Sequence, residues 1–298
     1  MLKKSLSLLL VLMLVLALFA GCQERPPQED PPPTPPDVQD PVGDDDPDTL
    51  RVRDIAPDFS AEIAVMYEIN DHTVGWIEVP GTNISDVVVR NPECRDNLYY
   101  LRRNIHREFY FDGIYYIDFR ADIGPTREYF GVNTTIYGHA MTDDPDEAAF
   151  NIMFGQLHNF RDEEFARYHP YILFGTDEET MVFEIFAIFY GNVYNPAFSY
   201  NNNPADPADF IYVIENAVLP RSLFFFDDIE FDETDRFLTL STCIYNPSCG
   251  TQLLHHRYTF YRFGIMARLV DPDAPLREYS NITINENRIV DPDGRWRG

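Results

Sequence analysis

Short apolar runs separated by turn residues dominate the chain from about residue 70 to residue 270. The runs at 74–79 and 84–89 flank Pro80-Gly81-Thr82-Asn83, which is typical of the turn in a β-hairpin. The same pattern predicts further strands at 113–118, 132–138, 170–174, 181–190, 237–242, 258–270 and, more weakly, 282–284. Seven or eight short strands favour a mostly β barrel or sandwich over a doubly wound parallel sheet.

Helical periodicity is confined to three segments. Apolar residues recur at three and four positions over 54–70, and Pro57 places the start of that helix near Asp58 or Ser60. The stretch 146–168 predicts two short helical pieces. The stretch 206–225 predicts a longer helix that Pro220 interrupts.

The first 22 residues have the pattern of an export signal, because Lys3 and Lys4 precede an apolar run over 8–20. The run ends in Phe19-Ala20-Gly21-Cys22, which resembles a bacterial lipoprotein signal with Cys22 as the lipid-modified residue. We therefore expect a lipid anchor at the extracellular face of the membrane. An uncleaved signal anchor and plain secretion are the alternatives.

The segments that follow differ sharply in composition. Residues 23–50 are mainly Pro, Asp and Glu with almost no apolar side chains, which predicts a disordered, extended tether. Residues 51–272 contain enough apolar residues for one folded domain, and 273–298 form a polar C-terminal tail. The formal net charge of −26 argues against nucleic acid as a partner and against electrostatic docking on anionic lipid.

Two predicted strands end on residues that can carry out nucleophilic chemistry. Cys243 ends the run at 237–242, and His139 follows Gly138 at the end of the strand 132–138. A cysteine nucleophile needs a base or a cation beside it to raise its thiolate fraction, and His139 is the best candidate. The remaining candidates are less suitable, because His106, His158 and His169 are expected to be exposed in polar stretches, while His72 lies in a turn.

Strand parity separates Arg262 from the apolar residues of its predicted strand. Side chains alternate between faces, so Phe263 and Ile265 lie on one face of the strand, and Arg262 lies on the other. An arginine there points away from the predicted core. If it lies beside Cys243, it can stabilise a tetrahedral oxyanion or hold a peptide carbonyl.

The other cysteines leave two alternatives open. Three cysteines remain once Cys22 is set aside, and Cys94 with Cys249 is a possible disulfide. Cys243, Cys249, His255 and His256 have the residue types of a zinc site, but their spacing is not that of a common zinc finger. We expect neither a metal nor an organic cofactor.

Several of these segments, taken together and in order, resemble the class B sortases. The resemblance is carried by Val74-Gly75-Trp76-Ile77, Pro80-Gly81-Thr82, residues 97–101, Gly113-Ile114-Tyr115-Tyr116-Ile117-Asp118, Tyr137-Gly138-His139-Ala140-Met141, Thr239-Leu240-Ser241-Thr242-Cys243 and residues 262–269. The most specific part is Thr-Leu-Ser-Thr-Cys with Tyr-Gly-His about a hundred residues before it. The resemblance implies a closed eight-stranded sortase-type β-barrel with an N-terminal helix and a helix before the cysteine strand.

The resemblance also implies an activity. Cys243 would attack a sorting signal after Thr, form a thioacyl enzyme and pass the acyl group to a cell-wall amine or a pilin lysine. His139 would act as general acid and base, and Arg262 as the oxyanion and substrate clamp, with Arg257 as a competing candidate because the intervening loop is long. Substrate contacts are expected from Ser241, Thr242 and Tyr137. The alternative is a catalytically silent, sortase-like lipoprotein that serves as a binding or adhesion module.

Overall fold

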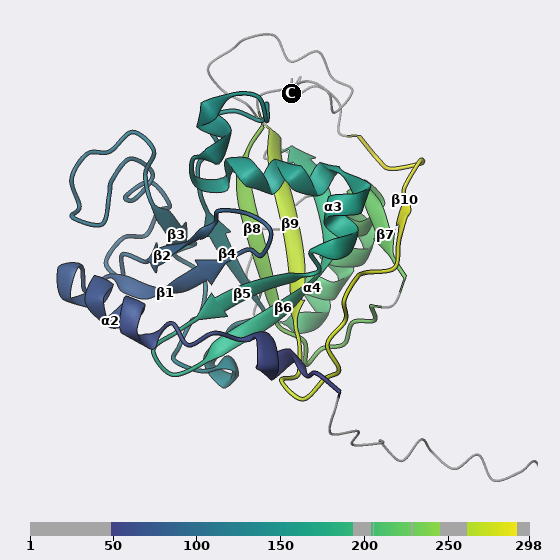
Figure 1. Cartoon of the computed structure of the whole chain (residues 1–298), viewed down its shortest axis with the longest axis horizontal. Helices are drawn as coiled ribbons and strands as arrows, with labels where there is room; N and C mark the ends of the chain where they lie inside the picture. The colour runs from purple at the N-terminus through teal and green to yellow at the C-terminus, as the bar shows by residue number, and fades with distance from the viewer. Residues whose placement is uncertain (1–48, 193–203, 205, 228, 245–260, 291–298) are drawn as a thin grey trace, which may run out of the picture. The chain divides into compact units, whose positions relative to one another are not determined.

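The computed structural model describes residues 49–192, 204, 206–227, 229–244 and 261–290, and its centre is a closed β-barrel (Figure 1). Neighbouring strands around the barrel follow the order β1-β2-β3-β4-β8-β9-β6-β5. Their bounds are β1 (Thr73–Glu78), β2 (Ser85–Val89), β3 (Tyr115–Ile117), β4 (Asn133–Tyr137), β5 (Tyr171–Gly175), β6 (Thr180–Asn192), β8 (Phe237–Cys243) and β9 (Tyr261–Leu269). The predicted eight-stranded, mostly β fold is confirmed.

Six of the barrel's strand pairs are antiparallel and two are parallel. The predicted hairpin forms from β1 and β2, and Gly81 in its turn has a φ of 81°, which favours glycine. The parallel pairs are β2 with β3 and β4 with β8. Parallel β4 and β8 run in one direction, so their C-terminal ends lie at the same edge of the barrel wall.

Apolar side chains cover both faces of the strands around β8. Leu238 and Leu240 of β8 pack inside the barrel with Phe263 and Ile265 of β9. Phe237 belongs to a second cluster on the outer face. That cluster is covered by a helix built from α4 (Pro207–Val213), η5 (Ile214–Val218) and η6 (Leu219–Arg221), as predicted for a helix before the cysteine strand.

The N-terminal helix begins at Ser60, as the position of Pro57 predicted. After η1 (Val52–Ile55), α2 runs over Ser60–Ile69 beside β1 (Figure 1), and the Asp58 carboxylate accepts a hydrogen bond from the Ser60 backbone N–H. Phe59 and Ile63 pack against Leu173 of β5. A further single turn, η2, spans Arg127–Tyr129.

The connection after β4 forms three helical pieces, where the sequence pattern predicts two. They are η3 (Ala148–Asn151), η4 (Met153–Arg161) and α3 (Glu163–Tyr168). Met153, with a φ of 51°, makes a sharp turn between η3 and η4. A methionine in this left-handed region is strained, and the two helices can change direction within one residue because of it.

The residues after the barrel pack onto it. β7 (Phe224–Phe226) pairs with β10 (Ile282–Ile284). The sequence pattern predicts β10 but not β7, because residues 206–225 have helical spacing. Ile282 is buried in the same cluster as the barrel interior, and the buried Asn285 side chain donates to the Ser222 carbonyl. The predicted polar tail therefore supplies a strand and core contacts.

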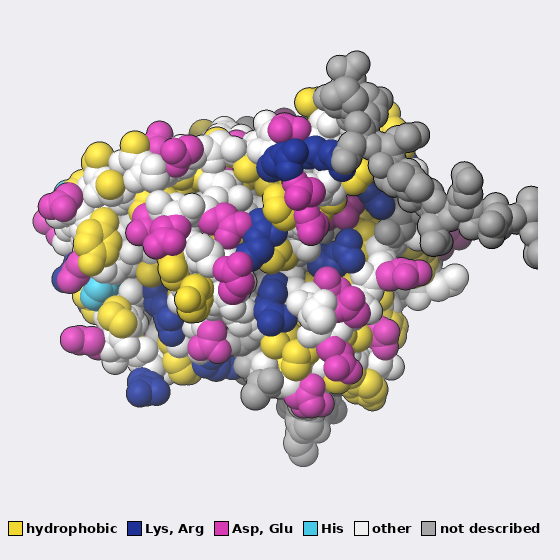
Figure 2. Space-filling model, turned by 90° about the horizontal axis from the view of Figure 1, so that it is seen from below, with side chains coloured by type: hydrophobic (Ala, Val, Ile, Leu, Met, Phe, Trp, Pro, Cys, Tyr) yellow, Lys and Arg dark blue, Asp and Glu magenta, His cyan; other side chains and the backbone are white. Residues whose placement is uncertain are grey.

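The face shown in Figure 2 carries acidic and basic side chains intermixed, with apolar ones scattered between them. Like charges do not gather there into a single-sign field of the kind that binds polyanions. Within the described ranges, no helix is long and apolar enough to cross a membrane.

Gly264 of β9 is predicted to be intolerant of a larger side chain. A Cβ at this position would lie 2.6 to 3.0 Å from three ring atoms of Phe189, which is fully buried. Gly264→Ala should lower the free energy of unfolding, measured by urea denaturation, by about 1–3 kcal/mol. Adding Phe189→Leu should recover part of that loss, although Phe189→Leu alone destabilises; additive losses would contradict the contact.

Candidate active site

Cys243 and Arg262 face each other across two neighbouring strands. They are direct partners in the antiparallel pairing of β8 with β9, at the last residue of one strand and the second residue of the other. Paired residues point to the same face of a sheet. Since Phe263 points into the barrel, Cys243 and Arg262 share the outer face, as strand parity predicts.

His139 lies beside Cys243 on the other flank of β8. The parallel pairing of β4 with β8 sets Tyr137 opposite Ser241, and the Thr242 hydroxyl donates to the Gly138 carbonyl at 2.9 Å. Continuing this register by two residues brings His139 level with Cys243. The three residues singled out from the sequence thus stand at three adjacent strand ends, with Cys243 in the middle.

One ring nitrogen of His139 is engaged in a hydrogen bond. Its Nε2 lies 2.7 Å from the Leu101 carbonyl oxygen. A carbonyl only accepts hydrogen bonds, so Nε2 carries the proton and Nδ1 is the acceptor in the neutral ring. Gly113 permits this approach, because its φ is 69° and a Cβ there would lie 2.7 Å from the same Leu101 oxygen.

Burial lowers the pKa of His139 below its usual value, although the hydrogen bond to Leu101 acts in the opposite direction. Arg102 and Arg262 add to the lowering, while Asp112 opposes it. The ring is therefore neutral near pH 7, with Nδ1 able to accept a proton.

Tyr116 of β3 completes the outer wall of the site. Burial raises the pKa of its phenol, and the neighbouring Arg262 acts in the opposite direction. Its ring packs against that of Tyr137, with centroids 5.4 Å apart. No sequence pattern singled out Tyr116, although it lies within a motif that carries the family resemblance.

The expectation that His158 is exposed is wrong. Its side chain is 2% exposed, its Nε2 donates to the Cys243 carbonyl at 3.1 Å, and burial lowers its pKa to about 3. A signal was present in the sequence, because His158 follows Phe154 by four residues, a spacing that would place both on one face of an α-helix, although the segment folds as a 3-10 helix.

Comparisons with known proteins agree with this geometry, although no protein-family model matches the chain. Sortase B of Listeria monocytogenes is 26% identical over 182 residues, which cover 61% of this chain and 67% of the relative. Sortase B of Clostridium perfringens has a structure with a TM-score of 0.56 and 26% identity, covering 70% of this chain and 99% of that one. The chain is a homologue of class B sortases.

A complex of Staphylococcus aureus sortase B with substrate shares the fold, with a TM-score of 0.56. Its identity is 22%, covering 71% of this chain and 85% of that chain, so this likeness concerns the fold alone.

The residues expected to contact substrate lie close to Cys243 in different environments. Ser241 is buried on the same face as Cys243, two residues before it. Thr242 is buried on the opposite face, where its hydroxyl joins β8 to β4. The Tyr137 hydroxyl donates to Asp118, whose carboxylate also accepts from Asn97 and Arg120. Their contacts with substrate stay predictions.

Burial alone would raise the pKa of Asp118, but hydrogen bonds from Arg120 and Tyr137 lower it. The carboxylate therefore stays ionised and fixes Tyr137 at the rim of the site. This network of Asp118, Asn97 and Arg120 was not predicted, because its members are spread over two loops and a strand end.

Several predicted residues lie outside the described part of the chain, namely Cys22, Cys249, His255, His256 and Arg257. The zinc and disulfide alternatives depend on them. Within the described ranges, no group of three or more His, Cys, Asp or Glu side chains could hold a metal ion. Cys94 is half-buried there, and its sulfur accepts a hydrogen bond from the Asn91 amide at 3.1 Å.

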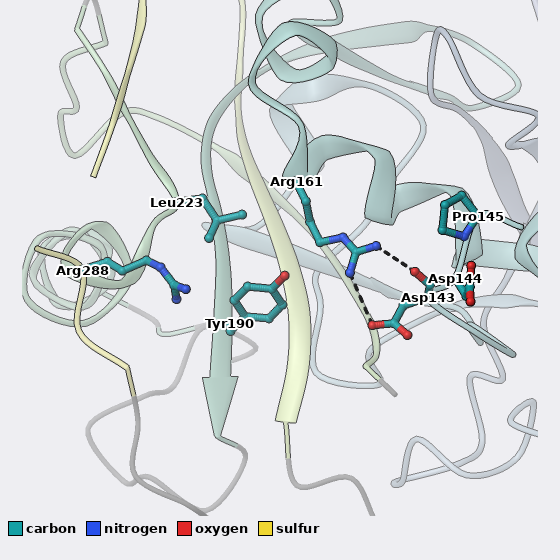
Figure 3. Close-up of a pocket in the computed structure, with 7 residues that line it drawn as sticks. All are labelled: Asp143, Asp144, Pro145, Arg161, Tyr190, Leu223 and Arg288. Carbon is teal, nitrogen blue, oxygen red and sulfur yellow. Dashed lines mark hydrogen bonds and ion pairs between the residues drawn. The ribbon is translucent and has the colours of Figure 1, made fainter. Parts of the chain in front are cut away.

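A pocket of about 440 Å³ is lined by Asp143, Arg161, Tyr190 and Arg288, among others. Tyr190 lines it and pairs with Phe263, so it belongs to the opposite face from Arg262. Figure 3 shows the Arg161 guanidinium pointing toward Asp143, while Arg288 lies on the other side of Leu223 and Tyr190. Neither Cys243 nor His139 is among the residues that line this pocket.

Charge substitutions around His139 should move its pKa in predictable directions. Arg102→Gln and Arg262→Gln should each raise it, since each removes a positive neighbour, whereas Asp112→Asn should lower it. The imidazole proton signals, followed by NMR between pH 4 and pH 8, report these shifts. A His139 pKa that did not move in Arg262→Gln would contradict the placement of the guanidinium beside the imidazole.

Proposed function

We propose that the chain is an extracellular cysteine transpeptidase that cleaves a C-terminal sorting signal after Thr and transfers the protein to an amine. The observation that carries the proposal is the alignment of His139, Cys243 and Arg262 at three adjacent strand ends, on one face, in a class B sortase homologue. A thiol, a base and a fixed cation in a row are the groups that acyl transfer requires.

In the first half-reaction, the Cys243 sulfur attacks the carbonyl carbon of the Thr residue in the sorting signal. His139 accepts the thiol proton at Nδ1, the atom that its bond to Leu101 leaves available. Arg262 donates to the carbonyl oxygen as it becomes negative. The C–N bond then breaks, the imidazolium returns the proton to the leaving amine, and a thioester with Cys243 remains.

In the second half-reaction, an acceptor amine attacks the thioester carbonyl. Neutral His139 takes a proton from the attacking nitrogen, and Arg262 again stabilises the oxyanion. The C–S bond breaks, the thiolate recovers the proton, and a new amide joins the surface protein to its acceptor. We propose a cell-wall peptidoglycan amine or a pilin lysine as that acceptor.

The related structures support both halves of the scheme. S. aureus sortase B forms a complex with substrate, and a further sortase B structure is a complex with triglycine, a peptide with a free amine. By analogy, we propose a sorting-signal peptide and an amine as the partners of this chain. The reaction as written calls on side chains of this chain alone.

Cleavage of fluorogenic peptides of the NPxTN, LPxTG and PPxTG types should separate the roles of the three residues. Cys243→Ala should abolish cleavage. Arg262→Lys should lower kcat/KM by about 100-fold, because an ammonium cannot reproduce the guanidinium fork. Arg257→Lys, the matched substitution, should stay close to wild type.

Two results would count against these assignments. Cleavage that survives in Cys243→Ala would reject the thioacyl mechanism, and a larger loss in Arg257→Lys than in Arg262→Lys would move the clamp to Arg257. An intact fold that neither cleaves nor forms an adduct at Cys243 with a thiol-reactive sorting-peptide mimic would instead favour the binding or adhesion module.

We also propose that a lipid on Cys22 anchors the domain at the outer face of the cell membrane. The apolar run at 8–20 followed by Ala20-Gly21-Cys22 supports this location. Cys22→Ala should abolish metabolic labelling with radioactive palmitate. Labelling that persists in this variant would show that the lipid is attached elsewhere.

A further inference from the structure

One helix, η4, is hydrogen-bonded to the backbones of both His139 and Cys243. The Phe154 backbone N–H donates to the His139 carbonyl at 2.7 Å, and the His158 side chain donates to the Cys243 carbonyl at 3.1 Å. We propose that His158 is a positioning residue, which holds the peptide group after Cys243 so that the thiol stays aligned with His139. This inference rests on the proposed role of Cys243 as nucleophile.

The ring of His158 is held firmly in its place. It packs on Phe263 with ring centroids 4.8 Å apart, and Phe263 is the partner of Thr242 in the pairing of β8 with β9. His158 therefore approaches β8 from the barrel interior, whereas Cys243 directs its sulfur to the outer face. His158 therefore contacts the backbone of Cys243 from the side opposite the sulfur and does not touch the reacting atoms.

The helix is also tied to the chain that follows His139. Arg161 donates from Nε to the His158 carbonyl at 3.0 Å, and its terminal nitrogens reach the Asp143 carbonyl at 2.7 Å and carboxylate at 3.4 Å (Figure 3). Asp143 is 3% exposed, so this ion pair is largely shielded from water. Through these contacts, η4 fixes the distance between the ends of β4 and β8.

The chemistry of the buried ring indicates why a histidine is present. In the part of the chain that the structure describes, Nδ1 of His158 has no hydrogen-bond partner. Burying a polar nitrogen without a partner is unfavourable, and an apolar ring would fill this place at lower cost. What imidazole supplies that phenyl lacks is the Nε2 donor to Cys243. Its low pKa keeps it a neutral donor throughout the working range of pH.

The position of the accepting carbonyl explains its importance. Cys243 is the last residue of β8, so regular strand pairing does not continue beyond it within the described residues. A donor at this carbonyl limits rotation of the peptide plane next to the residue that carries the sulfur. Loss of such alignment, even by about 1 Å, can cost about 100-fold in rate.

The test compares His158→Phe with His158→Gln in the full-length protein. Phe keeps the ring stack and removes the donor, whereas the Gln amide can donate to the same carbonyl. His158→Phe should lower kcat for peptide cleavage about 10- to 100-fold with little change in KM, and its Tm should equal or exceed that of wild type. His158→Gln should recover most of the kcat.

A second measurement needs no peptide substrate. Alkylation of Cys243 by iodoacetamide at pH 7, followed at the level of the modified peptide by mass spectrometry, should be several-fold slower in His158→Phe than in wild type. Peptide mapping separates Cys243 from the other cysteines. If wild type cleaves no sorting peptide, the proposed function fails, while the alkylation rates still decide whether His158 positions the thiol.

His169→Phe is the matched control. Its imidazole also bonds a backbone carbonyl, that of Phe165 at 2.8 Å, and stacks on the Phe165 ring, but it lies at the end of α3, away from the three strand ends. This variant should keep the kcat and alkylation rate of wild type. The inference is overturned if His158→Phe keeps the kcat and the alkylation rate of wild type. It is also overturned if both His158→Phe and His158→Gln lower kcat and Tm together.

Discussion

The site depends on the position of β8 between β4 and β9. Backbone hydrogen bonds set neighbouring strands about 4.8 Å apart and fix which residues stand side by side. One ladder places Cys243 opposite Arg262, and the other brings His139 level with Cys243. The alignment of the three groups is therefore a property of the backbone. A slip of β8 by one residue would turn Cys243 into the barrel interior.

Apolar contacts on both faces of β8 prevent such a slip. Leu238 and Leu240 are buried in the interior, and Phe237 is buried beneath α4 and η5. On the outer face, Phe237, Thr239 and Ser241 are all buried, and Cys243 at the end of the strand is partly exposed. Helix η4 adds a second constraint, from inside the barrel, at the end where the outer cover stops.

Apolar alternation in the sequence predicted the main strands and their faces around Cys243 and Arg262, but it left a barrel and a sandwich open. The closed eight-stranded barrel was implied by the resemblance to class B sortases. The sequence pattern failed for features that depend on distant contacts. The helical spacing over 206–225 predicted no strand at β7, which forms a strand by pairing with β10. The polar neighbours of His158 suggested exposure, yet packing on Phe263 buries it. The bond from His139 to Leu101 involves a carbonyl, which sequence patterns do not reveal.

The parallel pairing of β4 with β8 also bears on how the protein folds. Thr242 and Gly138, which join these strands, are 104 residues apart in the chain. Contacts of such high sequence separation form slowly, because a long loop must close before they can form. The thiol, the imidazole and the guanidinium therefore come together only when the barrel closes. A chain whose barrel has not closed, or a fragment that lacks β4, contains Cys243 without His139 beside it.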